Sequence, residues 1–186
     1  MRTLLNDMRK KKYGISEDSL AIFENIIQTH YVPGYGSREG EDAFKAALGE
    51  HLTEQQRFRL FEQHGACKGT SADKERKSFA LEHEHMTLAE RVALFNKTFG
   101  RNAVLHDDNT ITVNFACTHG YYKRVKEKKV TSLPPAAQSY FEQCAGGRLY
   151  ELEKALGIKL AIKSADISPL SENLMNPVVF TFAIAD

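Results

Sequence analysis

The sequence predicts an α+β protein in which a helical N-terminal half, residues 1–100, precedes a sheet-bearing half, residues 101–186. Apolar residues recur at the three- and four-residue spacing of helices as far as Gly100, and on alternate positions, as in strands, after it. The second half then reads as strand pair, long helix and strand pair. This order predicts an antiparallel sheet of about four strands, covered by helices on one face.

The chain's 186 residues fit one domain, 1–186, with a substantial hydrophobic core. The formal net charge is +1, from 25 Lys and Arg against 24 Asp and Glu, so no strong overall field favours nucleic acid, and we expect no nucleic-acid partner. No apolar run reaches the roughly 18 residues that a membrane span needs, and the polar N-terminus lacks the apolar stretch of a signal peptide. We therefore expect a cytoplasmic protein without a membrane span.

Five helices are predicted in the N-terminal half, each with apolar residues along one stripe. Two begin with a capping box, in which a Thr side chain and a Gln or Glu three residues later satisfy backbone N–H groups that the helix leaves free. Residues 1–14 fit either a short basic helix or a loose tail. The helices begin near Ser16, before Ala43, at Thr53, near Thr70 and at Thr87, and the capping boxes are Thr53–Gln56 and Thr87–Glu90.

The C-terminal half opens with a hairpin signal, two alternating segments around the turn Asp107-Asp108-Asn109. A basic stretch, residues 123–129, is best explained as a solvated face. Leu133-Pro134-Pro135 suits the entry of a long helix that ends before Gly157. The last two strands are marked by Ile158, Leu160 and Ile162, and by Phe180, Phe182 and Ile184.

Cys117 and His119 follow the predicted strand that ends the hairpin. They are two positions apart, so in extended backbone their side chains point to the same side. A thiol beside an imidazole suits contact with a ligand, zinc binding or an activated nucleophile. The alternative is a small buried thiol beside a surface histidine.

Cys144 lies in the predicted long helix, close to Gly146 and Gly147. Two glycines inside a helix cost roughly 1 kcal/mol each relative to Ala, so another reason for the missing side chains is expected. The glycines indicate close approach either of another stretch of backbone or of a ligand.

A zinc site is an alternative that would use Cys67, Cys117, His119 and Cys144. Three cysteines at long separations do not form a disulfide framework, and no close Cys-x-x-Cys pair of the usual zinc type is present. We therefore predict no cofactor and keep zinc as the alternative.

The order of motifs from about residue 65 to 186 resembles that of a family of uncharacterised bacterial proteins with cysteine-rich C-terminal halves. These proteins are similar to the 4-vinyl-reductase-type hydrocarbon-binding domain and to the L-2-amino-thiazoline-4-carboxylic acid hydrolase-like group. The motifs that carry the resemblance are Cys67-Lys68-Gly69-Thr70, Asn109–Val113, Cys117, Tyr140 with Cys144-Ala145-Gly146, Ala155–Leu160, Ser168-Pro169-Leu170 and Phe180–Ile184.

The resemblance implies helices packed on a twisted antiparallel sheet, with small or lipidic molecules bound between them. In that family the Cys-Ala-Gly helix and the segment after the hairpin often carry several cysteines and a following histidine. Here one thiol remains in the helix, and Gly147 stands where a histidine is expected, which weakens an implied metal site. Cys67, Cys117 and Cys144 are the positions that match.

We therefore expect a small-molecule binding domain for an apolar or heterocyclic acid, with a pocket between the sheet and the long helix. One alternative is a cysteine-dependent hydrolase of the thiazoline or amide type, with Cys117 or Cys144 as nucleophile and His119 as base. Another is a non-catalytic interaction or structural protein, including a homodimer. The expected pocket residues are Cys117, His119, Tyr121, Tyr140, Cys144, Gly146 and Gly147.

Overall fold

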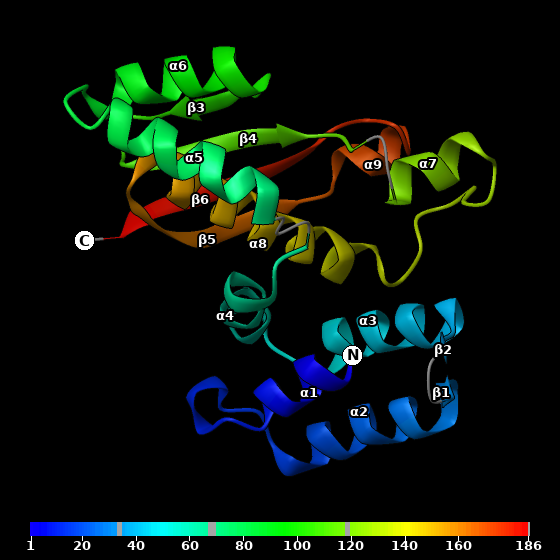
Figure 1. The fold of residues 1–186 in the computed structure, drawn as a ribbon. Coiled ribbons are helices and arrows are strands. Elements are labelled where there is room, and N and C mark those ends of the chain that lie inside the picture. Colours follow the sequence, from blue (N-terminus) through cyan, green and yellow to red (C-terminus); the bar gives the residue numbers. More distant parts are fainter. Residues whose placement is uncertain (33–34, 67–69, 118–119, 186) are drawn as a thin grey trace.

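The computed structural model describes residues 1–32, 35–66, 70–117 and 120–185. A group of N-terminal helices lies beside a second part in which helices pack against a four-stranded antiparallel sheet (Figure 1). The predicted α+β class is therefore confirmed. None of the described helices combines the length and apolar character needed to cross a bilayer.

The N-terminal part is built from four helices and a short strand pair. Residues 1–14, for which a helix and a loose tail were both open, form a helix and a 3₁₀ turn whose Leu5, Met8 and Tyr13 are buried. The elements are α1 (Arg2–Met8), η1 (Lys11–Tyr13), α2 (Glu17–His30), β1 (Tyr31–Val32), β2 (Tyr35–Gly36), α3 (Arg38–His51) and α4 (Glu54–His64).

The second part carries the sheet. Gly100 and Gly157 end their helices in the left-handed conformation, and Asn109 adopts it in the hairpin turn, as their positions predict. The elements are α5 (Thr70–Glu82), α6 (Leu88–Phe99), β3 (Ala103–Leu105), β4 (Thr110–Phe115), α7 (Gly120–Lys126), α8 (Ala137–Leu156), β5 (Lys159–Asp166), α9 (Pro169–Glu172) and β6 (Val178–Ala185).

Both predicted capping boxes form, at Thr53 before α4 and at Thr87 before α6. Most of the basic stretch, residues 123–129, is exposed, as predicted, and its first part folds as the short helix α7. Tyr121 and Tyr122, at the start of α7, are buried and anchor that helix on the rest of the molecule.

The strands are ordered β3-β4-β6-β5, and every neighbouring pair is antiparallel. The last strand of the chain therefore lies inside the sheet, where it pairs with both β4 and β5. Its Val178, Phe180 and Phe182 alternate with half-buried residues and point to the face that the helices cover. The long helix α8 runs beside this face and packs against α4 and α5 as well (Figure 1).

Candidate functional site

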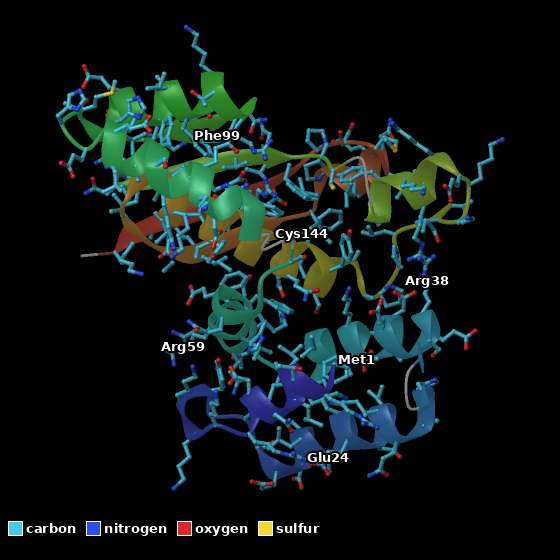
Figure 2. All side chains as sticks on the ribbon, viewed as in Figure 1. Met1, Glu24, Arg38, Arg59, Phe99 and Cys144 are labelled. Atoms are coloured by element: carbon cyan, nitrogen blue, oxygen red, sulfur yellow. The ribbon has the colours of Figure 1, made fainter. Side chains whose placement is uncertain are left out.

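One face of α8 meets the end of strand β4. Tyr140, Cys144 and Arg148 recur at four-residue intervals, which places them on one side of the helix. The Arg148 guanidinium carbon lies 5.7 Å from the centre of the Phe115 ring, on the last residue of β4. Cys117 follows two residues later, and Figure 2 shows Cys144 on α8. This junction brings the helix and the predicted Cys117 segment together.

Three arginines converge here on the carboxylate of Glu151, one turn beyond Arg148 on α8. Arg76, from α5, donates from Nη2 to Glu151 Oε1 at 2.7 Å. Arg101, just after the Gly100 cap, donates from Nη2 to the same oxygen at 2.9 Å. Arg148 donates from Nη1 to Oε2. We call Arg76, Arg101, Arg148 and Glu151 the triple-arginine cluster.

The cluster is ionised and carries an excess of positive charge. Burial by itself raises the pKa of Glu151, but the Arg101, Arg148 and Arg76 guanidinium groups outweigh it and lower that pKa below its ordinary value. A further carboxylate, Asp73, lies three residues before Arg76 on α5 and accepts a hydrogen bond from Tyr150. Even with that carboxylate counted, three guanidinium groups face two carboxylates.

The cluster opens from the protein interior onto a hollow. The Glu151 side chain is 3% exposed, that of Arg76 11%, Arg148 17% and Arg101 34%. The hollow has a volume of about 580 Å³ and lies between the end of β4, the segment after α6 and α8. Its walls are Gly100, Arg101, Asn102, Val113, Asn114, Phe115, Ala116, Cys117, Arg148 and Pro177. We call it the arginine hollow.

Arg148 keeps hydrogen-bond donors for a ligand. A guanidinium group has five N–H donors, and among the described residues Arg148 donates only to Glu151. Arg101 also donates from Nη1 to the Phe99 carbonyl at 3.0 Å, so it is held more fully. The Arg101 and Arg148 side chains are therefore held in place by Glu151 where they line the hollow.

The predicted site residues are only partly brought together. Cys117 is partly buried and lines the arginine hollow, whereas Cys144 is buried in the core. Tyr121 and Tyr140 line a different, smaller cavity of about 150 Å³, between α3, α7 and α8. The described residues therefore do not bring Cys117, Cys144, Tyr121 and Tyr140 into a single pocket.

The Tyr140 hydroxyl links these separate places. It accepts a hydrogen bond from the Tyr121 backbone N–H at 3.2 Å. Burial is the main cause that raises the pKa of Tyr140 to about 12, and the neighbouring Cys144 and Cys117 thiols contribute to the same rise. Both thiols therefore lie near one phenol, and Cys117 also lines the arginine hollow.

Gly146 and Gly147 lie where another stretch of backbone approaches α8, and neither lines the two hollows described above. A Cβ at Gly146 would overlap the Phe61 carbonyl, and a Cβ at Gly147 would overlap the Ala66 carbonyl. Ala66 also donates its backbone N–H to the Gln143 carbonyl at 2.9 Å. The glycines allow the end of α4 and the following residues to approach α8, which is the packing alternative that the sequence left open.

His119 and Cys67 lie outside the described residues, so the predicted approach of the His119 imidazole to the Cys117 thiol stays a prediction. In the part of the chain that the structure describes, no three His, Cys, Asp or Glu side chains lie together as metal ligands. The zinc alternative therefore stays an expectation from the sequence.

The site predicted from the sequence did not include Arg101, Arg148 and Glu151, because that prediction rested on thiol and imidazole side chains. A signal was nevertheless present. Arg148 falls four residues after Cys144 on the predicted helix, and Glu151 follows at the three-residue spacing of a helical ion pair. A charged pair on a helix otherwise expected to be buried is a marker of a polar site.

No protein-family model, curated protein or solved structure matches this chain. The resemblance of residues 65 to 186 to cysteine-containing bacterial proteins therefore stays a prediction. Geometry and charge at the arginine hollow are what indicate a function.

Proposed function

We propose that this protein binds a small organic acid in the arginine hollow. The observation that carries the proposal is the triple-arginine cluster, in which two arginines that share one buried carboxylate also line a hollow of about 580 Å³. A volume in the range of roughly 300–1,000 Å³ is usual for small-molecule sites. The ligand carboxylate would supply a further negative charge, which the excess of guanidinium groups favours.

The rest of the hollow supports a ligand with a flat, weakly polar body. Phe115 and Pro177 offer apolar surface, and the Phe115 ring already packs against Phe180 with 5.1 Å between ring centres. Asn102 and Asn114 supply amide groups at the rim. This combination fits an aromatic or heterocyclic acid, whose ring packs on Phe115 while its carboxylate reaches Arg148.

Paired ligands test the proposal. Aromatic, heterocyclic and thiazoline carboxylates are titrated into the protein by calorimetry, each beside its own primary amide, which has the same shape without the charge. The acids should bind and raise the melting temperature, and the amides should not. Equal binding of acids and amides, or no binding of any acid in the panel, would sink the proposal.

Variants locate the site. Arg148→Met should weaken acid binding by about tenfold or more, because a hydrogen bond to a charged group contributes roughly 1.5–3 kcal/mol. Arg59→Met, an exposed change on α4, is the matched control and should leave binding unchanged. An unchanged affinity in Arg148→Met would place the ligand elsewhere.

A cysteine-dependent hydrolase is the second candidate, and one observation favours it, because Cys117 lines the same hollow as Arg101 and Arg148. An acid held by the arginines would present its other end to the thiol. In such a reaction the sulfur attacks the C=O carbon of an amide or the C=N carbon of a thiazoline. The C–N bond of the amide, or the ring C–S bond of the thiazoline, then breaks, and the departing amine or thiol takes the proton of the Cys117 thiol. Water hydrolyses the S-bound intermediate, which releases the product and restores the thiol.

Turnover separates the two candidates. A hydrolase requires that wild-type protein consume a thiazoline or amide acid and that Cys117→Ala stop the reaction while acid affinity stays within about twofold. Binding without turnover by the wild-type protein would leave the binding function alone. Cys144→Ala is the matched thiol control, because Cys144 is buried away from the hollow.

A further inference from the structure

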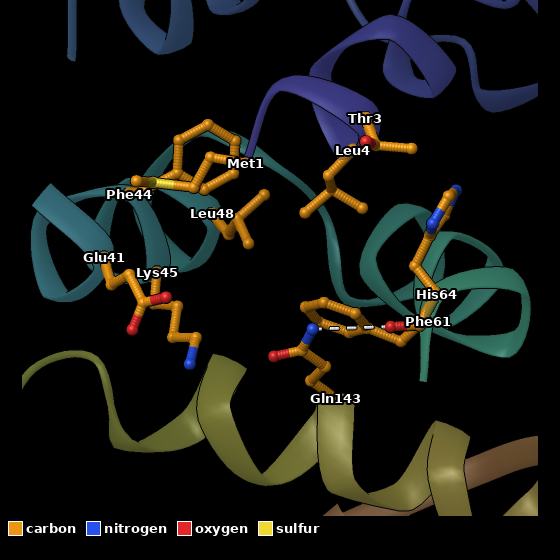
Figure 3. Close-up of a pocket in the computed structure, with 10 residues that line it drawn as sticks. All are labelled: Met1, Thr3, Leu4, Glu41, Phe44, Lys45, Leu48, Phe61, His64 and Gln143. Atoms are coloured by element: carbon orange, nitrogen blue, oxygen red, sulfur yellow. Dashed lines mark hydrogen bonds between the residues drawn. The ribbon is translucent and has the colours of Figure 1, made fainter. Parts of the chain in front are cut away.

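A second cavity lies at the junction of the N-terminal helices with α8. Its volume is about 230 Å³, and Figure 3 shows side chains from α1, α3, α4 and α8 pointing into it. It is separate from the arginine hollow, with which it shares no lining residue. The lining residues are Met1, Thr3, Leu4, Glu41, Phe44, Lys45, Leu48, Phe61, His64 and Gln143. We call it the junction cavity.

Apolar side chains form one end of the junction cavity. Phe44, Leu48 and Phe61 are almost completely buried, so they are fixed in place by the core behind them. Leu4 closes this end from α1 (Figure 3). An aliphatic or aromatic group could pack against these side chains.

Two opposite charges form the other end. Glu41 and Lys45 are one turn apart on α3 and both line the cavity. Among the described residues neither takes part in an ion pair, and the Lys45 ammonium instead lies 4.8 Å from the centre of the Tyr140 ring. Lys45 also points toward α8, the helix that carries Gln143 (Figure 3).

Gln143 adds a polar group between the charged and apolar ends. Its Nε2 donates to the His64 carbonyl at 3.4 Å, a long hydrogen bond that a better acceptor could replace. His64 is itself held by Asp7, with 2.8 Å between Nε2 and Oδ2. His64 is therefore a fixed part of the wall, and the Gln143 amide remains the adaptable donor.

We propose that the junction cavity binds the zwitterion of an α-amino acid with an apolar side chain. The ligand ammonium would face Glu41, its carboxylate would face Lys45 and Gln143, and its side chain would lie among Phe44, Leu48 and Phe61. A charged group leaves water at low cost only when it gains a partner, and this cavity offers one partner of each sign. A ligand with a single charge would leave Glu41 or Lys45 unpaired.

The size of the cavity agrees with this class. An apolar cavity of roughly 150 Å³ is enough to hold benzene in another protein. About 230 Å³ therefore accommodates a side chain of the size of Leu, Met or Phe with part of the amino-acid group at the mouth. Larger zwitterions such as peptides should be excluded.

A series of three ligands tests the charges on wild-type protein. L-Leucine carries both charges, 4-methylpentanoate lacks the ammonium group, and 3-methylbutylamine lacks the carboxylate. Binding measured by calorimetry or protein NMR should be strongest for leucine and weaker by roughly tenfold or more for the other two. No binding of leucine, methionine or phenylalanine, or equal binding of either singly charged compound by the Arg148→Met protein, in which acid binding at the arginine hollow is weakened, overturns the proposal.

Variants assign each charge. Lys45→Met should weaken leucine but leave 3-methylbutylamine unchanged, and Glu41→Gln should weaken leucine but leave 4-methylpentanoate unchanged. The matched controls are Lys97→Met on α6 and Glu50→Gln on α3, both exposed and outside the cavity. Loss of leucine binding in a control, or none in Lys45→Met, contradicts the assignment.

The two proposals fail separately. Arg148→Met removes acid binding at the arginine hollow and should leave leucine binding intact, whereas Lys45→Met should do the reverse. NMR signals that move with leucine should belong to α3 and α4, and signals that move with an aromatic acid to β4. Leucine that shifts only β4 signals would refute the junction site.

Discussion

Helix α8 carries two buried glutamates, and the protein treats them differently. Glu142 is completely buried and has one guanidinium partner, Arg57, whose Nε and Nη2 donate to its two oxygens at 2.7 and 2.9 Å. Glu151, nine residues later, is surrounded by three arginines, two of which line the arginine hollow. The first pair is balanced in charge, whereas the second cluster carries an excess of positive charge.

Arg57 also lines a hollow, of about 450 Å³, but its charge is balanced there by Glu142. Arg57 uses its remaining group to donate to the Leu52 carbonyl at 2.7 Å, and Gln138 donates to Glu142 at 3.1 Å. The Arg57–Glu142 ion pair joins α4 to α8 and thereby holds the N-terminal helices on the sheet-bearing part. The triple-arginine cluster also joins elements, but its extra guanidinium groups exceed what the fold alone needs. Local charge balance is therefore what separates a structural ion pair from a candidate site.

The largest expected effect is that of Glu142→Gln, which tests the structural half of this contrast. The change leaves Arg57 buried without a counter-charge, and breaking a buried pair in this way costs roughly 3–5 kcal/mol. Urea unfolding measures the loss in free energy of unfolding, and exposed Glu50→Gln is the control. A loss below about 1 kcal/mol would show that the pair does not hold α4 to α8.

Glu151→Gln tests the other half of the contrast and should cost less, about 2–3 kcal/mol, because Arg101 and Arg148 can turn toward water. The variant also removes the carboxylate that the three guanidinium groups share. An aromatic acid or sulfate should therefore raise its melting temperature more than that of wild type. If anions stabilise both proteins equally, the excess charge is not available to a ligand.

The sequence predicted features that depend on neighbouring residues. Thr53 and Thr87 capped their helices as expected, and Gly100 and Gly157 ended theirs, because a cap is decided within a few positions. The hairpin around Asn109 followed for the same reason.

The partners of the buried charges could not be predicted in this way. Arg57 and Glu142 are 85 positions apart, and Arg76 and Glu151 are 75 apart. Only the packing of α4 and α5 on α8 makes them neighbours. For the same reason the sequence, which drew attention to Cys117 and Cys144 by residue type, could not predict that one lines a hollow and the other fills the core.

Gly147→Ala tests the segment of α8 that lies between the two glutamates. A Cβ there would overlap the Ala66 carbonyl, so the end of α4 must shift and the free energy of unfolding should fall by about 1–3 kcal/mol. Gly49→Ala on α3 is the matched control, because its Cβ would make an ordinary contact with Ser139 and should stabilise the helix by roughly 0.5–1 kcal/mol. A Gly147→Ala protein as stable as wild type would return the glycines to a pocket wall.

The smallest expected effect concerns Asp7, an ionised carboxylate at the edge of the junction, away from both α8 glutamates. Hydrogen bonds from Lys10, Tyr13 and His64 lower the pKa of Asp7 well below its ordinary value of 3.8. The folded state therefore favours the ionised form. The ionised Asp7 contributes fully to stability at pH values above 3.8, the pKa of the carboxyl in the unfolded chain. This contribution is lost as the pH falls below 3.8 toward the lower pKa of the folded state.

Asp7→Asn should consequently lower the free energy of unfolding by about 1 kcal/mol near neutral pH, and the difference from wild type should shrink below about pH 4. Urea unfolding at several pH values measures it. Tyr13→Phe removes one donor, at 2.7 Å, and keeps the carboxylate, so it should show a smaller pH-dependent difference of the same sign. A difference that stays constant from neutral to acid pH would mean that Asp7 stabilises the fold through shape rather than charge, unlike the two glutamates of α8.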